Sequence, residues 1–213
     1  MSRHTDQACL ICKSVVIRVF DFLSRCQGDL ATNSVERDLH AQRGGFCALH
    51  TWQYEQVASS RGVCVGYSEF LQSVGERLLA IAGEAAAVDE LVCELEKFRT
   101  AWPLCNACEV AVKAEEEALG GALTRLIAVT ARNDALPLLC FTHLTALASR
   151  CTDLGKVRLL VEQHGEELKR VAEDMRQYIA KFEALRRDLI SAREREAPGR
   201  GLMLLAGRTE HIP

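Results

Sequence analysis

Two kinds of cysteine pair, each occurring twice and in the same order, constrain this chain more than any other feature. A Cys-x-x-Cys pair in "CLIC" is followed by a Cys-x-x-His pair in "CALH", and "CNAC" and "CFTH" repeat the arrangement. The spacers between the paired motifs are nearly equal, residues 13–46 in the first copy and 109–139 in the second. The order and the spacing predict an internal duplication with a period of about 95 residues.

Helical periodicity surrounds these motifs. Apolar residues recur at helical spacing in "CLICKSVVIRVFDFLSRC" and again in one long amphipathic stretch from Val157 to Ser191. The chain has only four prolines and few segments that alternate with period two. We therefore expect an all-α fold, in which duplicated helical repeats form a compact bundle with two Cys/His metal sites. The expected divisions are a first metal-binding repeat over 1–100, a second over 101–190, and a C-terminal tail over 191–213.

The motif spacing suits metal chelation. Residues three apart at a helix N-terminus project from one face, so each pair can bind one ion. Two such ends that face each other within a repeat supply three thiolates and one imidazole, a common set for tetrahedral structural zinc. Helix N-termini also stabilise thiolates. The predicted ligands are Cys9, Cys12, Cys47 and His50 in the first repeat, and Cys105, Cys108, Cys140 and His143 in the second.

The expected cofactor is Zn²⁺, two ions per chain, because four protein ligands leave no open coordination position. An iron–sulfur cluster is the alternative, since Cys-x-x-Cys pairs serve both chemistries. Covalent haem is disfavoured, because Lys13 and Glu109 follow the Cys pairs where a histidine is required. A thioredoxin-like dithiol is disfavoured as well, because no βαβ pattern surrounds the pairs.

The other cysteines, histidines and tryptophans have no comparable pattern. Four cysteines within or beside helical segments are expected to pack in the core: Cys26, Cys64, Cys93 and Cys151. Four histidines are expected to be exposed or incidental: His4, His40, His164 and His211. Trp52 and Trp102 flank metal motifs, and we expect them to shield the sites.

The composition disfavours several classes of partner. A net charge of −3 gives no basic field for nucleic acid or an anionic membrane. No run of about twenty apolar residues is present that could span a bilayer. The N-terminal "MSRHTDQACLICK" lacks the apolar region of a secretory signal, so we expect a cytoplasmic protein. The chain has ten cysteines, and in a reducing compartment regularly spaced cysteines are more often metal ligands or catalytic thiols than disulfides.

The motifs "CLIC", "GFCALH", "CNAC" and "LCFTH" resemble those of an uncharacterised bacterial family, a domain of unknown function. Members of that family carry duplicated Cys-x-x-Cys and Gly-Phe-Cys-x-x-His motifs in one helical chain. The closing segment "KFEALRRDLISAREREAPGRGLMLLAG" is similar too, so the likeness covers nearly the whole chain. The second copy departs from it, with Leu-Leu in place of Gly-Phe before Cys140. The resemblance implies metal binding and no particular activity.

Three functions are compatible with these features. The favoured one is a non-catalytic zinc protein, a helical scaffold that binds another protein. The second is a redox or electron-transfer protein that uses iron–sulfur clusters or reactive zinc thiolates. An enzyme is least favoured, because the sequence offers no nucleophile–base motif and no glycine loop for phosphate.

Overall fold

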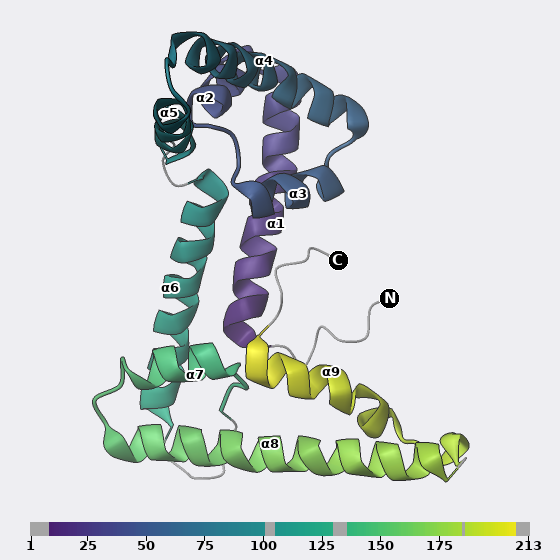
Figure 1. Ribbon diagram of the computed structural model, residues 1–213. Coiled ribbons are helices and arrows are strands. Elements are labelled where there is room, and N and C mark those ends of the chain that lie inside the picture. The colour runs from purple at the N-terminus through teal and green to yellow at the C-terminus, as the bar shows by residue number, and fades with distance from the viewer. Residues whose placement is uncertain (1–8, 101–104, 130–135, 185, 208–213) are drawn as a thin grey trace. The chain divides into compact units, whose positions relative to one another are not determined.

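The computed structural model describes residues 9–100, 105–129, 136–184 and 186–207 (Figure 1). Over these residues the regular structure consists of nine α-helices and one 3₁₀-helix, which confirms the all-α prediction. The chain divides into two compact units, each of which takes residues from both predicted repeats. Unit 1 comprises residues 9–16 and 113–207, and unit 2 comprises residues 17–112.

These units differ from the expected repeats because two long helices pass from one unit into the other. Helix α1 (Leu10–Thr32) begins in unit 1 and continues into unit 2. Helix α6 (Asn106–Ala128) begins in unit 2 and continues into unit 1. Each unit is therefore completed by a segment of the other repeat.

Unit 1 has a core built where the start of α1 meets α6, α7 (Phe141–Ala148) and α8 (Leu154–Glu183). Two of the predicted ligands, Cys9 and Cys140, are members of this core, so metal-ligating and core side chains pack against each other. The buried members are Cys9, Ile11, Leu119, Ala122, Leu126, Leu139, Cys140, Leu144, Leu147 and Leu160.

Helix α8 packs along α9 (Ala192–Ala206) in unit 1 (Figure 1). The expected continuous helix from Val157 to Ser191 is interrupted: α8 ends at Glu183, and a 3₁₀ turn, η1 (Arg187–Leu189), leads to α9. The break is local chemistry, because Ser191 and Glu194 form a reciprocal capping box that starts a new helix. The apolar segment "LMLLAG" forms the end of α9 and its C-cap.

Ion pairs join α8 to α9 as well. Arg200 is 6% exposed and lies 3.2 Å from Glu167 and 3.3 Å from Asp174. Lys181 donates to the carboxylate of Glu194 at 2.7 Å. Buried pairs of this kind fix the register of two packed helices, because removing one partner leaves a charge without compensation.

Unit 2 contains the rest of α1, α2 (Ser34–Gln42), α3 (Ala48–Val57), α4 (Ser60–Glu84), α5 (Val88–Thr100) and the start of α6. Helix α2 packs on α4, and aromatic rings fill the space beside them. The ring centroids of Phe46 and Tyr54 are 5.5 Å apart, and those of Tyr54 and Tyr67 are 5.8 Å apart. These contacts form the core of unit 2 next to the first Cys-x-x-His pair, Cys47 and His50.

His40 belongs to this aromatic cluster, so the prediction that it is exposed is wrong. Its ring centroid lies 4.6 Å from that of Phe46 and 5.2 Å from that of Tyr67. Burial lowers the pKa of His40 to about 4, because the aromatic surroundings disfavour the charged ring. The imidazole is therefore neutral at pH 7.

None of the helices in the described ranges combines the length and the apolar character needed to cross a membrane.

Candidate metal centres

The eight predicted ligands gather into two groups, and the four ligand atoms of each group all lie within 4.8 Å of one another. Site A consists of Cys9, Cys12, Cys140 and His143, and site B consists of Cys47, His50, Cys105 and Cys108. Site A lies in unit 1 and site B lies in unit 2. The prediction that each site forms within one repeat is wrong. Each site takes its Cys-x-x-Cys pair from one repeat and its Cys-x-x-His pair from the other.

Helix length explains the exchange of ligands. Helix α1 has 23 residues, so its far end lies about 35 Å from Cys9. The nine residues of α2 are too short to bring the chain back to the same place, since they rise only about 14 Å. Helix α6, also 23 residues long, carries the chain away from Cys105 in the same manner. The Cys-x-x-His pair of each repeat therefore emerges beside the start of the other long helix.

In each site, a hydrogen bond joins the segment that carries the Cys-x-x-Cys pair to the segment that carries the Cys-x-x-His pair. In site A, the backbone N–H of Leu10 donates to the carbonyl of Leu138 at 3.4 Å, which joins the start of α1 to the segment before Cys140. In site B, the guanidinium of Arg43 donates to the side-chain oxygen of Asn106 at 3.0 Å, which joins the turn before Cys47 to the start of α6.

All four pairs lie at helix N-termini, as the motif spacing predicts. Cys9 and Cys105 directly precede α1 and α6. Cys47 and Cys140 are the N-caps of α3 and α7, with nearly the same backbone conformation: φ −63° and ψ 166° for Cys47, φ −74° and ψ 165° for Cys140. Replacing Gly-Phe by Leu-Leu in the second copy therefore leaves the cap conformation unchanged.

Different residues lead the chain into these two caps. Before Cys47, Gly44 and Gly45 adopt φ values of 78° and 69°, a left-handed turn that glycine favours. Before Cys140, the N–H of Leu139 donates to Nε2 of His164 at 2.9 Å. Nδ1 of His164 lies 2.9 Å from the carbonyl of Leu160 on the preceding turn of α8. His164 is buried between two backbone partners, so the prediction that it is exposed is wrong.

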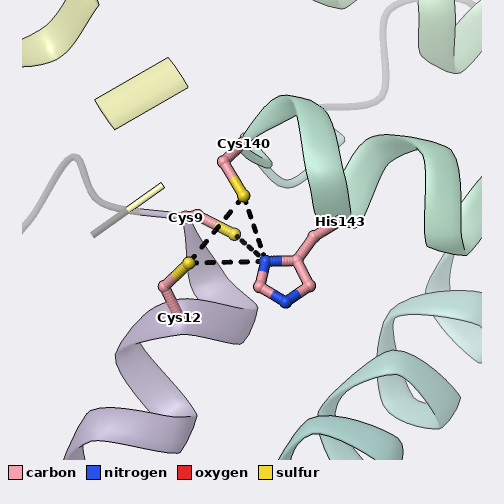
Figure 2. A group of neighbouring side chains, drawn as sticks. All are labelled: Cys9, Cys12, Cys140 and His143. Atoms are coloured by element: carbon pink, nitrogen blue, oxygen red, sulfur yellow. Dashed lines mark hydrogen bonds between the residues drawn. The ribbon is translucent and has the colours of Figure 1, made fainter. Parts of the chain in front are cut away.

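Figure 2 shows the four side chains of site A converging, with Nδ1 of His143 turned toward the sulfurs. That nitrogen lies 3.3 Å from the sulfur of Cys9, 3.4 Å from that of Cys12 and 3.1 Å from that of Cys140. The sulfurs of Cys12 and Cys140 are 3.8 Å apart. In a tetrahedral zinc site with Zn–S bonds of about 2.3 Å, neighbouring sulfurs are about 3.8 Å apart. The dimensions of site A therefore fit a single tetrahedral ion.

Site B is similar in size, with one shorter sulfur–sulfur distance. Nδ1 of His50 lies 3.2 Å from the sulfur of Cys47 and 3.3 Å from those of Cys105 and Cys108. The sulfurs of Cys47 and Cys108 are 3.7 Å apart, and those of Cys105 and Cys108 are 3.3 Å apart. The N–H of Cys108 also donates to the sulfur of Cys105, which helps a thiolate at the start of α6.

The electrostatics of both sites favour bound positive charge. Contacts with Cys12 and Cys140 lower the pKa of Cys9, and contacts with Cys140 and Cys9 raise the pKa of His143 to about 10. In site B, burial and the neighbouring Cys105 raise the pKa of Cys108, because a second thiolate close to the first is unfavourable. A divalent cation at the centre would remove this repulsion and hold all three thiolates deprotonated.

Site A has two further neighbours that the sequence did not single out. Nε2 of His143 lies 3.3 Å from a carboxylate oxygen of Glu115, so the carboxylate holds the ring with Nδ1 toward the sulfurs.

Gly207, the C-cap of α9, has φ 76° and ψ −173°. A Cβ atom on Gly207 would lie 3.1 Å from the sulfur of Cys140 and 3.2 Å from that of Cys12. Glu115 is one of three consecutive glutamates and Gly207 one of fourteen glycines, so neither is distinctive in the sequence.

Outside the two sites, several expectations are wrong or lie outside the described residues. None of the ten cysteines, all of which lie in the described ranges, forms a disulfide. Cys64 and Cys93 are exposed instead of buried, and Cys26 and Cys151 are half-buried. Trp52 is 68% exposed and shields neither site. His4, Trp102 and His211 lie outside the described residues.

No known protein family, curated protein or solved structure matches the chain. The two Cys/His sites are therefore the basis on which a function can be assigned.

Proposed function

We propose that the protein is a zinc-binding helical scaffold in which sites A and B each hold one Zn²⁺ through three cysteines and one histidine. The observation that carries the proposal is the convergence of eight ligand-type side chains from four separate segments into two groups, each of single-ion size. Structural zinc contributes binding energy to folding and is redox-inactive. Four protein ligands complete its coordination and leave no position for a substrate.

The sulfur spacing favours zinc over an iron–sulfur cluster. A cluster attaches its cysteines to different iron atoms, which spreads the sulfurs around a larger inorganic core. Here the contacting sulfurs are 3.3 to 3.8 Å apart, about the edge of a tetrahedron around one ion. A single iron ion would fit the same geometry, so metal analysis and colour distinguish the two.

Zinc at these positions would cross-link helices that are far apart in the sequence. Site A ties the start of α1 to α7, and site B ties the turn after α2 to the start of α6. The units lack disulfides among the described cysteines, so metal bonds are the cross-links available to them. Loss of the ion would leave three neighbouring cysteines in each site whose thiolates repel one another.

Exposed apolar side chains in unit 2 support a role in binding another protein. Leu71 and Leu79 on α4 are 64% and 76% exposed, and Val88 on α5 is 75% exposed. Helix α5 has no buried residue. Large exposed apolar side chains on neighbouring helices are typical of protein interaction surfaces. The partner would bind this face while zinc holds the helices beneath it.

The first test is elemental analysis with an ultraviolet–visible spectrum of protein purified without oxygen. We expect about two zinc ions per chain and a colourless solution. Cys105→Ser should lose about one zinc equivalent, whereas Cys93→Ser, an exposed cysteine outside both sites, should lose none. Iron with a coloured spectrum, or equal metal content in the two variants, would contradict the proposal.

The scaffold role needs a separate test. Cross-linking in cells followed by mass spectrometry would compare the native chain with a Leu71→Glu, Leu79→Glu variant. We expect the variant to keep both zinc ions and to lose the cross-linked partner. Cross-links that are unchanged in the variant would refute binding through this face while leaving the metal assignment intact.

A further inference from the structure

The duplication supplies two equivalent sulfur pairs, one in each site. Cys12 and Cys108 are the second cysteines of their Cys-x-x-Cys motifs, and Cys140 and Cys47 are the helix N-caps opposite them. The sulfur–sulfur distance is 3.8 Å for Cys12 and Cys140 and 3.7 Å for Cys108 and Cys47. Any difference in reactivity between the pairs must therefore come from their surroundings.

The surroundings differ sharply. In site A, Cys140 is 1% exposed and Cys12 is half-buried, and Gly207 lies so close that a Cβ atom on it would come 3.1 and 3.2 Å from the two sulfurs. In site B, Cys47 is exposed and Cys108 is half-buried. The third cysteine of site B, Cys105, is only 6% exposed. The two pairs thus differ at the N-cap cysteine, which is exposed in site B and buried in site A.

We infer that site B is an oxidant-sensitive zinc site: a peroxide joins Cys47 and Cys108 in a disulfide and releases the ion, while site A keeps its zinc. The inference rests on the proposed zinc binding and adds a regulatory modification to it. Cys47, the exposed cysteine, supplies the thiolate that attacks the peroxide. Cys108 resolves the product, because its sulfur lies 3.7 Å from that of Cys47 and it is half-buried, whereas Cys105 is buried.

The chemistry balances with hydrogen peroxide as the oxidant. The Cys47 thiolate attacks one peroxide oxygen; a sulfur–oxygen bond forms, the oxygen–oxygen bond breaks, and hydroxide leaves. The Cys108 thiolate then attacks the oxidised sulfur; the disulfide forms, the sulfur–oxygen bond breaks, and a second hydroxide leaves. Two thiolates lose two electrons, and the peroxide gains them. His50 and Cys105 alone are too few ligands to retain Zn²⁺, so the ion dissociates.

The same oxidant can approach site A through a pocket. A pocket of about 180 Å³ beside it is lined by Cys12, Cys140, His143 and Glu115, among others. A small peroxide that entered this pocket would meet a sulfur pair packed against Gly207. Joining that pair requires the sulfurs to close from 3.8 Å beside Gly207, where there is no room for even a Cβ atom. We expect slower oxidation of site A for this reason.

The test uses the full zinc-loaded chain with Cys64→Ser and Cys93→Ser. These two substitutions remove exposed thiols that would react without releasing metal. The protein is treated with hydrogen peroxide in the presence of a chromophoric chelator, and zinc release is followed over time. We expect one zinc equivalent to appear about tenfold faster than the second, since the rate follows thiolate access.

Tryptic peptides identify the disulfide that accompanies the fast phase. Cys47 is the only cysteine of peptide 44–61, whereas Cys105 and Cys108 share peptide 100–113. The expected product is these two peptides joined, with fragmentation placing the bond at Cys108. A disulfide in site A would instead join peptide 4–13 to peptide 133–150.

Three results would overturn the inference. Release of both zinc equivalents at one rate would show that the burial of Cys140 beside Gly207 does not slow the oxidation of site A. A fast-phase disulfide within peptide 100–113, or one between the two site A peptides, would refute the assigned pair. In both cases the zinc content before oxidation would still support the proposed function. A chain that holds no zinc before oxidation would refute the two proposals together.

Discussion

The exchange of ligands between the repeats gives a prediction in which two rival pairings yield opposite results. One variant carries Cys12→Ser and Cys140→Ser, and the other carries Cys12→Ser and Cys47→Ser. In the structure, the first variant loses two ligands of site A and none of site B. The second variant loses one ligand from each site. We therefore expect the first variant to keep one zinc ion and the second to keep none in the presence of a moderate chelator.

The size of the effect follows from the energy of structural zinc. Binding of one Zn²⁺ to such a site has an apparent free energy of about 10–16 kcal/mol, and a folded domain has a net stability of about 5–15 kcal/mol. Loss of site A should therefore loosen unit 1, which holds α7, α8 and α9 with 8, 30 and 15 residues. The first variant should lose helical circular dichroism accordingly.

The assay is the zinc content per chain after gel filtration in chelator, with the protein concentration measured independently. Each single substitution serves as a control and should cost one equivalent. If ligands paired within a repeat, the outcome would be inverted: the Cys12, Cys47 variant would keep one ion and the Cys12, Cys140 variant would keep none. That inversion would refute the crossed arrangement and the helix-length argument behind it.

Three further predictions concern residues that are not metal ligands. Gly207→Ala should lower the zinc affinity of site A by about tenfold or more. The backbone at this position, with φ 76° and ψ −173°, is nearly restricted to glycine, and the new Cβ would meet two sulfurs. A competition titration with a chelating dye measures the change in affinity. Glu115→Ala should lower that affinity by about tenfold, because the carboxylate orients the His143 ring from 3.3 Å; the same titration applies. His40→Phe should remove a pH dependence of folding. The pKa of His40 is about 4 in the folded protein and 6.5 for a free histidine side chain. Between pH 7 and pH 5 the unfolded chain therefore binds a proton at His40 that the folded protein does not, and the native protein loses about 2 kcal/mol of stability. Denaturant unfolding of the native and His40→Phe proteins at the two pH values measures the difference.

Each of these predictions has a matched control in the chain. Gly165→Ala adds a Cβ where nothing lies within 4 Å and should leave zinc affinity unchanged. Glu116→Ala removes the neighbouring carboxylate, which pairs with Arg150 at the surface. An equal loss of affinity in either control would contradict the contacts assigned to Gly207 or Glu115. For His40, the same acid loss of stability in the native and His40→Phe proteins would show that protonation of the metal ligands causes it.

Local patterns predicted the local structure well. The two apolar periodicities beside the cysteine motifs indicated helices, and the spacing of three placed each ligand pair at a helix N-terminus. Gly44 and Gly45, which follow the end of α2, adopt the positive φ values that glycine favours in a turn. These features succeed because capping, turn chemistry and helical spacing depend on residues within one or two turns of each other.

Predictions about burial were less successful. The exposed Cys64 and Cys93 and the buried His164 all lie within helices of the expected kind. The cysteines were expected in the core because they lie within or beside helical segments, but a helix face is buried only if another element packs against it. His164 is buried because the backbone of the segment before Cys140 uses its ring as a hydrogen-bond acceptor. That partner lies 25 residues away, beyond the reach of any local pattern.

The sequence by itself determined the helical class, the eight side chains that come together, and their grouping into four pairs. Only the tertiary structure decided which pairs meet, and it also decided that Gly207 covers one site while Cys47 of the other is exposed. The physical reason is that the residues of a motif determine only their local backbone conformation. Which Cys-x-x-Cys pair meets which Cys-x-x-His pair depends on where the ends of two long helices lie. Helices α1 and α6 are each 23 residues long and carry each repeat away from its own first motif to that of the other.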